Sequence, residues 1–320
     1  MDKRTKILYG ILLVGAVLAP FVGGYPLFLM SALCFALFAC AFNLLIGFTG
    51  LLSFGHAMFF GMAAYFCGHA AKVWGLTPEL AVLIGTAGAA AMGYLVGWLA
   101  VRRQGIYFAM VTLALSQMVY FICVQAPFTG AEDGLQNVPR GKAFGLINLQ
   151  STPHDPLFGV IPVSDDIVMY YFVLALFLLG FGVIYRAIYS PFGQVLKSIR
   201  ENEPRALSLG YDVDKYKLMA FVLSAALAGM AGALKALSVG AASLTDVSWQ
   251  MSGEVVLMTL LGGMGTILGP VLGATTIITM QNYLAGFGSW VTIIMGVTFV
   301  VCVLAFRRGI VGEIAYRLKR

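Results

Sequence analysis

The sequence predicts an all-α, polytopic integral membrane protein that forms a single domain over residues 1–320. Three observations lead to this prediction: 60% of the residues are hydrophobic, only 11% are charged, and the apolar residues gather in long blocks. A soluble domain carries about 25% charged residues. The chain therefore has too few polar side chains to cover a water-soluble globule, and lipid must be its main solvent.

Nine apolar blocks are each nearly free of charge. Their lengths approach the roughly 20 residues that a helix needs to cross the hydrocarbon core of a bilayer. The blocks are Ile7–Val22, Leu27–Ile46, Leu51–Val73, Leu80–Val101, Ile106–Ala126, Ile167–Tyr185, Leu218–Leu237, Val255–Ala274 and Ser289–Phe306. A shorter segment at Thr275–Ala285 brings the expected number of hydrophobic segments to about ten. A membrane barrel is excluded because its strands would alternate polar and apolar residues, which these blocks do not.

The first block follows Lys3, Arg4 and Lys6, as the apolar region of a signal peptide would. Val17–Ala19 matches a small-residue cleavage site only incompletely. The same charge pattern also orients an uncleaved helix. We therefore expect the first block to remain as a membrane span.

Lysine and arginine are enriched in cytoplasmic loops of membrane proteins. With the N-terminus inside and ten crossings, all but four of the 20 basic residues fall on the inner side. The four on the outer side are Lys72, Arg140, Lys142 and Lys235. This distribution predicts that both termini are cytoplasmic. Nucleic-acid binding does not explain the net charge of +6, because the basic residues are scattered over separate segments.

Two loops are long. Residues 127–166 form an outer, periplasmic loop that is rich in proline, glycine and acidic residues, and residues 187–217 form a cytoplasmic loop with many charges of both signs.

The block at residues 80–101 carries small residues three to five positions apart, which predicts close helix packing in lipid.

Two apolar stretches are interrupted by glycines, at residues 47–55 and 262–270, one in each half of the chain. Corresponding interrupted helices in transporters mark a pathway at the interface of inverted repeats. Irregular backbone at membrane depth requires protein or water to satisfy its polar groups. The two stretches therefore predict either a pathway with Gly-broken or re-entrant segments and a possible inverted repeat, or a pair of tight turns between spans.

The cytoplasmic loop contains two short predicted helices. The first has apolar residues at helical spacing, namely Phe192, Val195, Leu196 and Ile199. The second begins near Pro204 and ends before Gly210, with an apolar patch made of Ala206, Leu207 and Leu209. Asp212 or Asp214 is suited to cap the next spanning helix. Mixed charge signs favour a protein partner over a lipid surface for these helices.

Five stretches in this order resemble one family: NLLIGFTGLLSFGHAMFFGMAAY, GIYFAMVTLALSQ, TGAEDGLQNVPR, SPFGQVLKSIRENEPRALSLGYDVDKYKLMAFVLSAALAGMAGAL and WQMSGEVVLMTLLGGMGTILGP. They are similar to branched-chain amino acid ABC transporter permeases of the LivM type. The resemblance covers the chain from Asn43 to Pro270. One departure is Ala131, where relatives often carry a second glycine after Thr129-Gly130.

The resemblance implies a permease subunit of a bacterial inner-membrane importer for branched-chain amino acids or related amide solutes. Its partners would be a second homologous permease, two cytoplasmic ABC ATPases, a periplasmic solute-binding protein and membrane lipid, with no nucleic acid. The residues expected to couple to the ATPase are Arg200, Glu201, Asn202, Glu203, Arg205 and Gly210. The residues expected to dock the binding protein are Thr129, Gly130, Glu132, Asp133 and Gly134.

The chain carries no phosphate-binding loop of the type that ATPases use. Such a loop needs a Ser or Thr after its Gly-Lys pair, and the only Gly-Lys pair, Gly141-Lys142, is followed by Ala143. We therefore expect no ATP site and no bound cofactor, with ATP consumed by partner subunits. The five cysteines lie in or at the edge of apolar blocks and predict neither disulfides nor a metal site.

An intramembrane hydrolase is a weaker interpretation. Ser53 and His56 are close enough to share a helix face, but no nucleophile-elbow motif or nearby acid accompanies them. A channel for ammonium or urea is a second alternative, although His56 and His69 would point in nearly opposite directions on one helix. A secondary transporter is a third, for which Glu254 is the candidate coupling acid.

Polar residues inside apolar blocks are candidates to line a solute pathway, because unpartnered polar groups are costly in lipid. These residues are Asn43, Ser53, His56, Thr112, Gln117 and Glu254. Each is also compatible with a purely structural role, in which a neighbouring helix satisfies the polar group. For Glu254 the structural role would be to complement the N-terminus of its helix.

Overall fold

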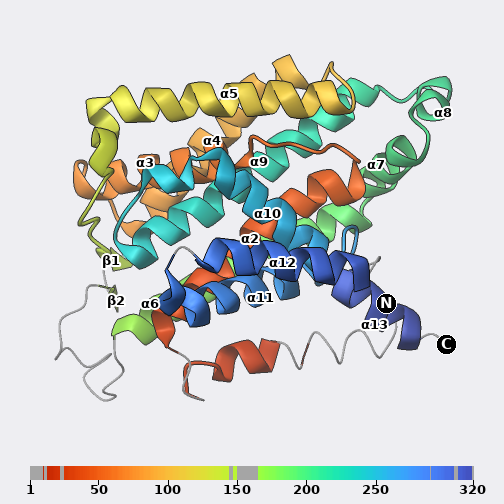
Figure 1. The fold of residues 1–320 in the computed structure, drawn as a ribbon. Coiled ribbons are helices and arrows are strands. Elements are labelled where there is room, and N and C mark those ends of the chain that lie inside the picture. Colours follow the sequence, from red (N-terminus) through yellow and green to blue (C-terminus); the bar gives the residue numbers. More distant parts are fainter. Residues whose placement is uncertain are drawn as a thin grey trace.

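The computed structural model describes residues 10, 13–21, 25–143, 147–149, 165–288, 290–305 and 309–318. These residues form a bundle of helices that run roughly along one common direction (Figure 1). The exception to the helical architecture is a pair of two-residue antiparallel strands, β1 (Lys142–Ala143) and β2 (Ile147–Asn148). The prediction of an all-α fold is confirmed.

Six helices are long: α2 (Pro26–Phe48), α3 (His56–Lys72), α4 (Pro78–Ala100), α5 (Ile106–Gln125), α6 (Asp165–Tyr189) and α9 (Val213–Val239). The shorter α-helices are α7 (Pro191–Glu201), α8 (Glu203–Ser208), α10 (Trp249–Gly262), α11 (Gly269–Leu284), α12 (Trp290–Ala305) and α13 (Gly309–Leu318). Single 3₁₀ turns are η1 (Pro127–Thr129), η2 (Ala131–Asp133), η3 (Leu244–Asp246) and η4 (Ala285–Phe287). Among the described residues, α2, α4, α5, α6 and α9 are long and apolar enough to cross a membrane.

Helices α2 and α9 form the centre of the bundle. In their most apolar 18-residue stretches, 78% and 72% of the residues are buried, against 33–39% for α4, α5 and α6. Close packing around α9 depends on small residues. A Cβ atom on Gly232 would lie 1.9 Å from the carbonyl oxygen of Phe60, and one on Gly93 would lie 2.5 Å from the Cβ of Ala225. The predicted role of the small residues in packing is therefore confirmed for α4.

Two of the predicted apolar blocks have different boundaries in the structure. Val255–Ala274 is not one span, because α10 ends at Gly262 and α11 begins at Gly269. Thr275–Ala285 is not a separate segment, since its residues up to position 284 continue α11. The break falls where Gly263 and Gly265 have φ values of 115° and 75°, which a hydropathy pattern does not register. The helix within Leu51–Val73 likewise begins only at position 56.

The first apolar block lies partly outside the described residues. Within it, residues 13–18 are helical, and the backbone carbonyl of Ala16 accepts a hydrogen bond of 2.6 Å from the hydroxyl of Tyr170 on α6. The first segment therefore packs beside α6. That this segment remains uncleaved stays a prediction.

The two ends of the bundle carry different structures, with α7 and α8 at one end and the β1–β2 pair at the other (Figure 1). We call them the α7–α8 end and the hairpin end. The four basic residues predicted to face outside, Lys72, Arg140, Lys142 and Lys235, lie on elements of the hairpin end. Basic residues on elements of the α7–α8 end include Arg102, Arg103, Arg186, Lys197, Arg200, Arg205, Lys215 and Lys217.

The long loop at the hairpin end is held to the bundle by backbone pairing and one ion pair. Leu135 and Ala242 exchange two backbone hydrogen bonds of 2.9 and 2.8 Å. Arg140 forms an ion pair of 2.7 Å with Asp166 and also donates to the carbonyl of Ser238 at 2.8 Å. Residues 144–146 and 150–164 of the predicted loop lie outside the described residues.

Ala131 adopts a left-handed backbone conformation, with φ of 53°. An L-residue with a side chain pays roughly 1–2 kcal/mol in this region, whereas glycine does not. Ala131, where the resemblance led us to expect glycine, therefore introduces backbone strain into the turn between η1 and η2.

We expect Ala131→Gly to raise the free energy of unfolding by about 0.5–1 kcal/mol, because glycine removes the strain but adds entropy to the unfolded chain. Denaturant titration of the protein in detergent micelles measures the change. The control is Ala126→Gly, since Ala126 has an ordinary φ of −80° and should only lose stability. Equal destabilisation by both variants would contradict the assignment.

Candidate functional site

The two Gly-broken stretches meet at the α7–α8 end, and Asn43 joins them. Asn43 is buried in α2, one turn before the chain leaves that helix. Its side-chain nitrogen donates to the carbonyl of Thr266 at 2.8 Å, and its side-chain oxygen accepts from the backbone N–H of Gly265 at 2.9 Å. A Cβ atom on Gly47 would lie 2.7 Å from the nitrogen of Gly265, so the two backbones touch. We call this contact the glycine junction.

Arg200 of α7 reaches the same junction from outside the bundle. Its Nη1 atom donates a hydrogen bond to the carbonyl oxygen of Gly47 and lies beside Gly265, while its aliphatic stem lies against Gly50. One exposed helix is thereby bonded directly to the first Gly-broken stretch and contacts the second. A surface cavity of about 360 Å³ opens here, lined by Gly47, Phe48, Lys197, Arg200, Glu201 and Gly265.

Helices α7 and α8 form one small unit with the start of α9. Its apolar core consists of Val195, Ile199, Ala206 and Val213, with Tyr216 packed against it. Asn202 caps α8 by accepting from the backbone N–H of Arg205 at 3.1 Å, and Gly210, with φ of 86°, ends it. Of the predicted apolar patch, Ala206 is only 1% exposed, because its face of α8 turns toward this core. Leu207 and Leu209 are 56% and 68% exposed.

A buried ion pair fixes α8 to α9. The ammonium of Lys217, whose side chain is 3% exposed, lies 2.7 Å from a carboxylate oxygen of Glu203. The same oxygen accepts from the side chain of Gln104, between α4 and α5, at 3.0 Å. Asp212 caps α9 as predicted, accepting from the backbone of Lys215. Hydrogen bonding to the ammonium of Lys215 lowers the pKa of the Asp212 carboxyl.

Ser53, His56 and Thr112 lie together at the first turn of α3 and are all fully buried. Thr112 of α5 accepts from the backbone N–H of Phe54 at 3.3 Å, and Ser53 accepts from that of Gly55 at 3.2 Å. These bonds satisfy amides that the interrupted helix would otherwise leave unpaired in the membrane. Their predicted contact with solute is not tested by this arrangement and stays a prediction.

His56 pairs with Ser224 of α9 and not with Ser53. Its Nε2 atom lies 2.9 Å from the hydroxyl of Ser224, which itself donates to the carbonyl of Ala41 at 2.6 Å. Since that hydroxyl has one proton, Nε2 must be the donor to it. The rings of Phe42, Phe59 and Phe221 surround the imidazole. Nδ1 has no hydrogen-bond partner among the described residues.

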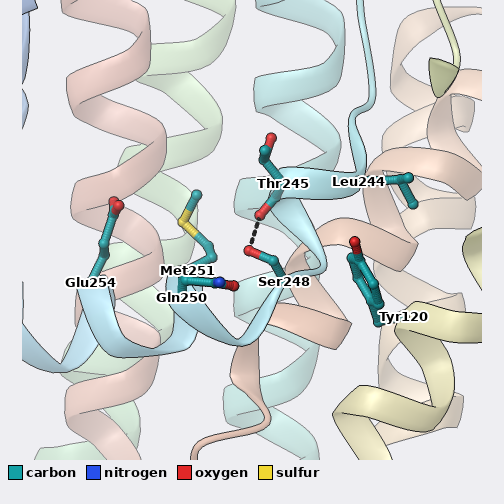
Figure 2. Close-up of a pocket in the computed structure, with 7 residues that line it drawn as sticks. All are labelled: Tyr120, Leu244, Thr245, Ser248, Gln250, Met251 and Glu254. Atoms are coloured by element: carbon teal, nitrogen blue, oxygen red, sulfur yellow. Dashed lines mark hydrogen bonds between the residues drawn. The ribbon is translucent and has the colours of Figure 1, made fainter. Parts of the chain in front are cut away.

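A groove of about 340 Å³ opens where η3 leads into α10, and it contains Glu254. Its lining residues are Tyr120, Leu244, Thr245, Ser248, Gln250, Met251 and Glu254. Figure 2 shows that all of them except Tyr120 come from the continuous stretch of η3 and α10, while Tyr120 comes from α5. We call this cavity the η3–α10 groove. Gln117, also on α5, is half-buried.

The turn beside this groove is anchored by a second buried ion pair. Lys235 of α9 contacts both carboxylate oxygens of Asp246 at 2.6 and 2.7 Å, and Asp246 is 1% exposed. Asp246 also accepts from the hydroxyl of Ser243 at 3.1 Å. The start of the groove is therefore fixed to the central helix of the bundle.

The residues expected to dock a binding protein form a compact turn at the hairpin end. Thr129 is buried and its hydroxyl donates to the carbonyls of Cys123 and Ala126. Gly130 and Gly134 have positive φ and approach each other closely, whereas Glu132 and Asp133 are exposed. The acidic pair is thus available at the surface, and the other three residues shape the turn.

Several polar residues at these sites were not predicted from the sequence. Ser224, Ser252 and Gln281 bond to His56, to the backbone of Ala57 and to Glu254, respectively. Their partners lie 168, 195 and 27 positions away, so no local pattern could identify them. The sequence did contain a pattern that could have predicted the groove: serine and threonine residues recur just before the final interrupted apolar block. Within the described residues, no group of His, Cys, Asp and Glu could hold a metal ion.

Comparisons with known proteins place these features in a family. A family model described as "Branched-chain amino acid transport system / permease component" matches residues 26–303. The chain is 28% identical to the high-affinity branched-chain amino acid transport system permease protein LivM of Salmonella typhimurium strain LT2, covering 99% of this chain and 77% of that protein. The identity and both coverages are the same for LivM of Escherichia coli strain K12. No solved structure matches the chain.

We expect Asn43→Ala to lower the free energy of unfolding by about 2–5 kcal/mol, because it leaves the partly buried N–H of Gly265 and the partly buried carbonyl of Thr266 without partners. Denaturant titration in detergent micelles measures the loss. Thr86→Ala is the matched control, since Thr86 bonds only to the carbonyl of Val82 within its own helix. A loss no larger than that of the control would contradict the role of Asn43 at the glycine junction.

Proposed function

We propose a role for this chain, which belongs to the family of branched-chain amino acid transport system permease components: it is a membrane subunit of an ABC importer whose separate ATPases act on α7 and α8. The solutes are branched-chain amino acids or related amino acids and amides. The observation that carries the proposal is the hydrogen bond from Arg200 to Gly47. It connects an exposed helix to the interrupted part of the membrane domain.

The α7–α8 unit has the surface expected of a protein-docking element. Leu207 and Leu209 are exposed beside charged residues, and an apolar patch with a polar rim is typical of a protein interface. The high density of basic residues at this end supports a cytoplasmic position for it. In this orientation the ATPases reach α7 and α8 from the cytoplasm, and both chain termini lie on that side.

Two contacts would carry a displacement of the α7–α8 unit into the membrane. Arg200 transmits it to the glycine junction, and the Glu203–Lys217 ion pair transmits it to α9 and, through Gln104, to the α4–α5 connection. Because the ion pair is buried, separating its charges costs several kcal/mol, so α8 and α9 move together. The interrupted segments at the junction lack continuous helical hydrogen bonds, which makes them the parts best able to change conformation.

The hairpin end would face the periplasm and receive solute from a binding protein. Glu132 and Asp133 are exposed there, on a turn that is shaped by Gly130 and Gly134. An acidic surface steers a partner with a basic rim and fixes its orientation. A second permease of the same family would complete the pathway, as the names of the relatives imply a multi-subunit transport system.

We expect the double substitution Leu207→Ser with Leu209→Ser to weaken ATPase association at least tenfold, because burial of each leucine contributes roughly 1.5–3 kcal/mol. Co-purification of the ATPases from solubilised membranes measures it. Both side chains are exposed, so folding should be unaffected. The control is Gln194→Ser on the exposed side of α7. Undiminished co-purification by the double variant would rule out this docking surface.

We expect Arg200→Gln to reduce solute uptake at least tenfold while the ATPases still bind and hydrolyse ATP, because the link to Gly47 is lost. The measurement compares ATP hydrolysis and uptake by the complete transporter in proteoliposomes. Lys215→Gln is the control, since Lys215 pairs only with Asp212 at the surface. Normal coupled uptake by the Arg200 variant, or wild-type uptake that needs no ATP, would refute the proposal.

A further inference from the structure

The η3–α10 groove combines a suitable size with an unusual carboxylate. Its volume of about 340 Å³ lies at the lower end of the range of roughly 300–1,000 Å³ that holds small ligands. Polar groups of Thr245, Ser248, Gln250 and Glu254 share the groove with apolar groups of Leu244, Met251 and Tyr120 (Figure 2). The groove can therefore accommodate one small solute that has both a polar and an apolar part.

Glu254 differs from three other acids whose side chains are tied to the bundle. Glu203, Asp246 and Asp166 each form an ion pair of 2.7 Å or less with a lysine or arginine. Glu254 instead accepts a hydrogen bond of 3.1 Å from the neutral amide of Gln281. Among the described residues, no lysine or arginine lies within ion-pairing distance of it. Holding an ionised carboxylate inside a membrane protein costs free energy when no positive charge is paired with it.

Lys235, which is paired with η3 at the start of the groove, cannot supply that partner. Its ammonium contacts both carboxylate oxygens of Asp246. Moving it toward Glu254 would leave Asp246 buried with no positive charge, at a cost of several kcal/mol. The groove therefore presents one carboxylate that has no positive partner among the described residues.

We propose that Glu254 binds the ammonium group of the transported solute in the η3–α10 groove, so that the permease itself favours solutes with an amino group over neutral amides and urea. This inference rests on the proposed importer function. The carboxylate accepts hydrogen bonds from the ammonium, Gln281 holds the carboxylate in place, and the solute side chain lies toward Leu244 and Met251. Solute binding removes the cost of the uncompensated charge at each transport cycle.

The test is uptake of radiolabelled L-leucine by the cells that naturally produce the protein, with codon 254 changed to give Glu254→Gln or Glu254→Asp. Glu254→Gln keeps the shape and the hydrogen bond to Gln281 but removes the charge. We expect it to lower the uptake rate at subsaturating leucine about tenfold to a hundredfold. Glu254→Asp should retain most uptake. The control is Asp214→Asn, an exposed acid at the α7–α8 end.

Each alternative outcome has a defined meaning, with membrane levels of each variant measured by immunoblot. Wild-type uptake by Glu254→Gln would overturn the inference. So would failure of that variant to assemble with the second permease, since Glu254 would then be an interface residue. ATP-dependent import of urea or 4-methylpentanamide in preference to leucine would also overturn it, yet leave the importer function intact. Leucine uptake that persists after loss of the ATPase genes would instead refute the importer function.

Discussion

The need to satisfy backbone polar groups inside a membrane is the constraint on which this structure depends. Two helical segments are interrupted, after α2 and between α10 and α11, and each break exposes amides and carbonyls that lipid cannot hydrogen-bond. The structure brings both breaks into contact, so that Asn43 satisfies groups on the second while Arg200 satisfies a carbonyl of the first. Irregular backbone is thereby tolerated where it would otherwise unfold the bundle.

This arrangement has a mechanical consequence, because one of the two side chains that hydrogen-bond to the interrupted backbone belongs to a helix outside the spanning bundle. Arg200 sits on α7, which is packed with α8 and the start of α9 into a separate apolar core. In the proposed importer, an ATPase that moves this unit would change the hydrogen bonding of the junction directly. The opposite end, with the exposed acids of η2 and the groove beside α10, is tied to the same helices through the Lys235–Asp246 pair. The proposed site of solute entry and the proposed ATPase contact thus lie at opposite ends of a shared set of helices.

Hydropathy and spacing predicted most of the spans, the two helices of the α7–α8 unit and the cap at Asp212, because these depend on local sequence. Hydropathy alone joined residues 255–274 into one span, whereas the glycines at residues 262–270 did predict the break between α10 and α11. The partners of His56 and Glu254 were missed because they are brought together only by tertiary packing. The sequence grouped Ala206 with Leu207 and Leu209 in one apolar patch and could not separate them, because an apolar residue on a short helix can face either a partner or the core.

The central claim is that Arg200 transmits motion of α7 to the glycine junction. Spin labels at Met264→Cys in the junction and Leu95→Cys on α4, both exposed positions, report that motion as a distance in the complete transporter. The account predicts that ATP binding shifts this distance when Arg200 is present and leaves it unchanged in the Arg200→Gln background. A shift of the same size in both backgrounds would contradict it.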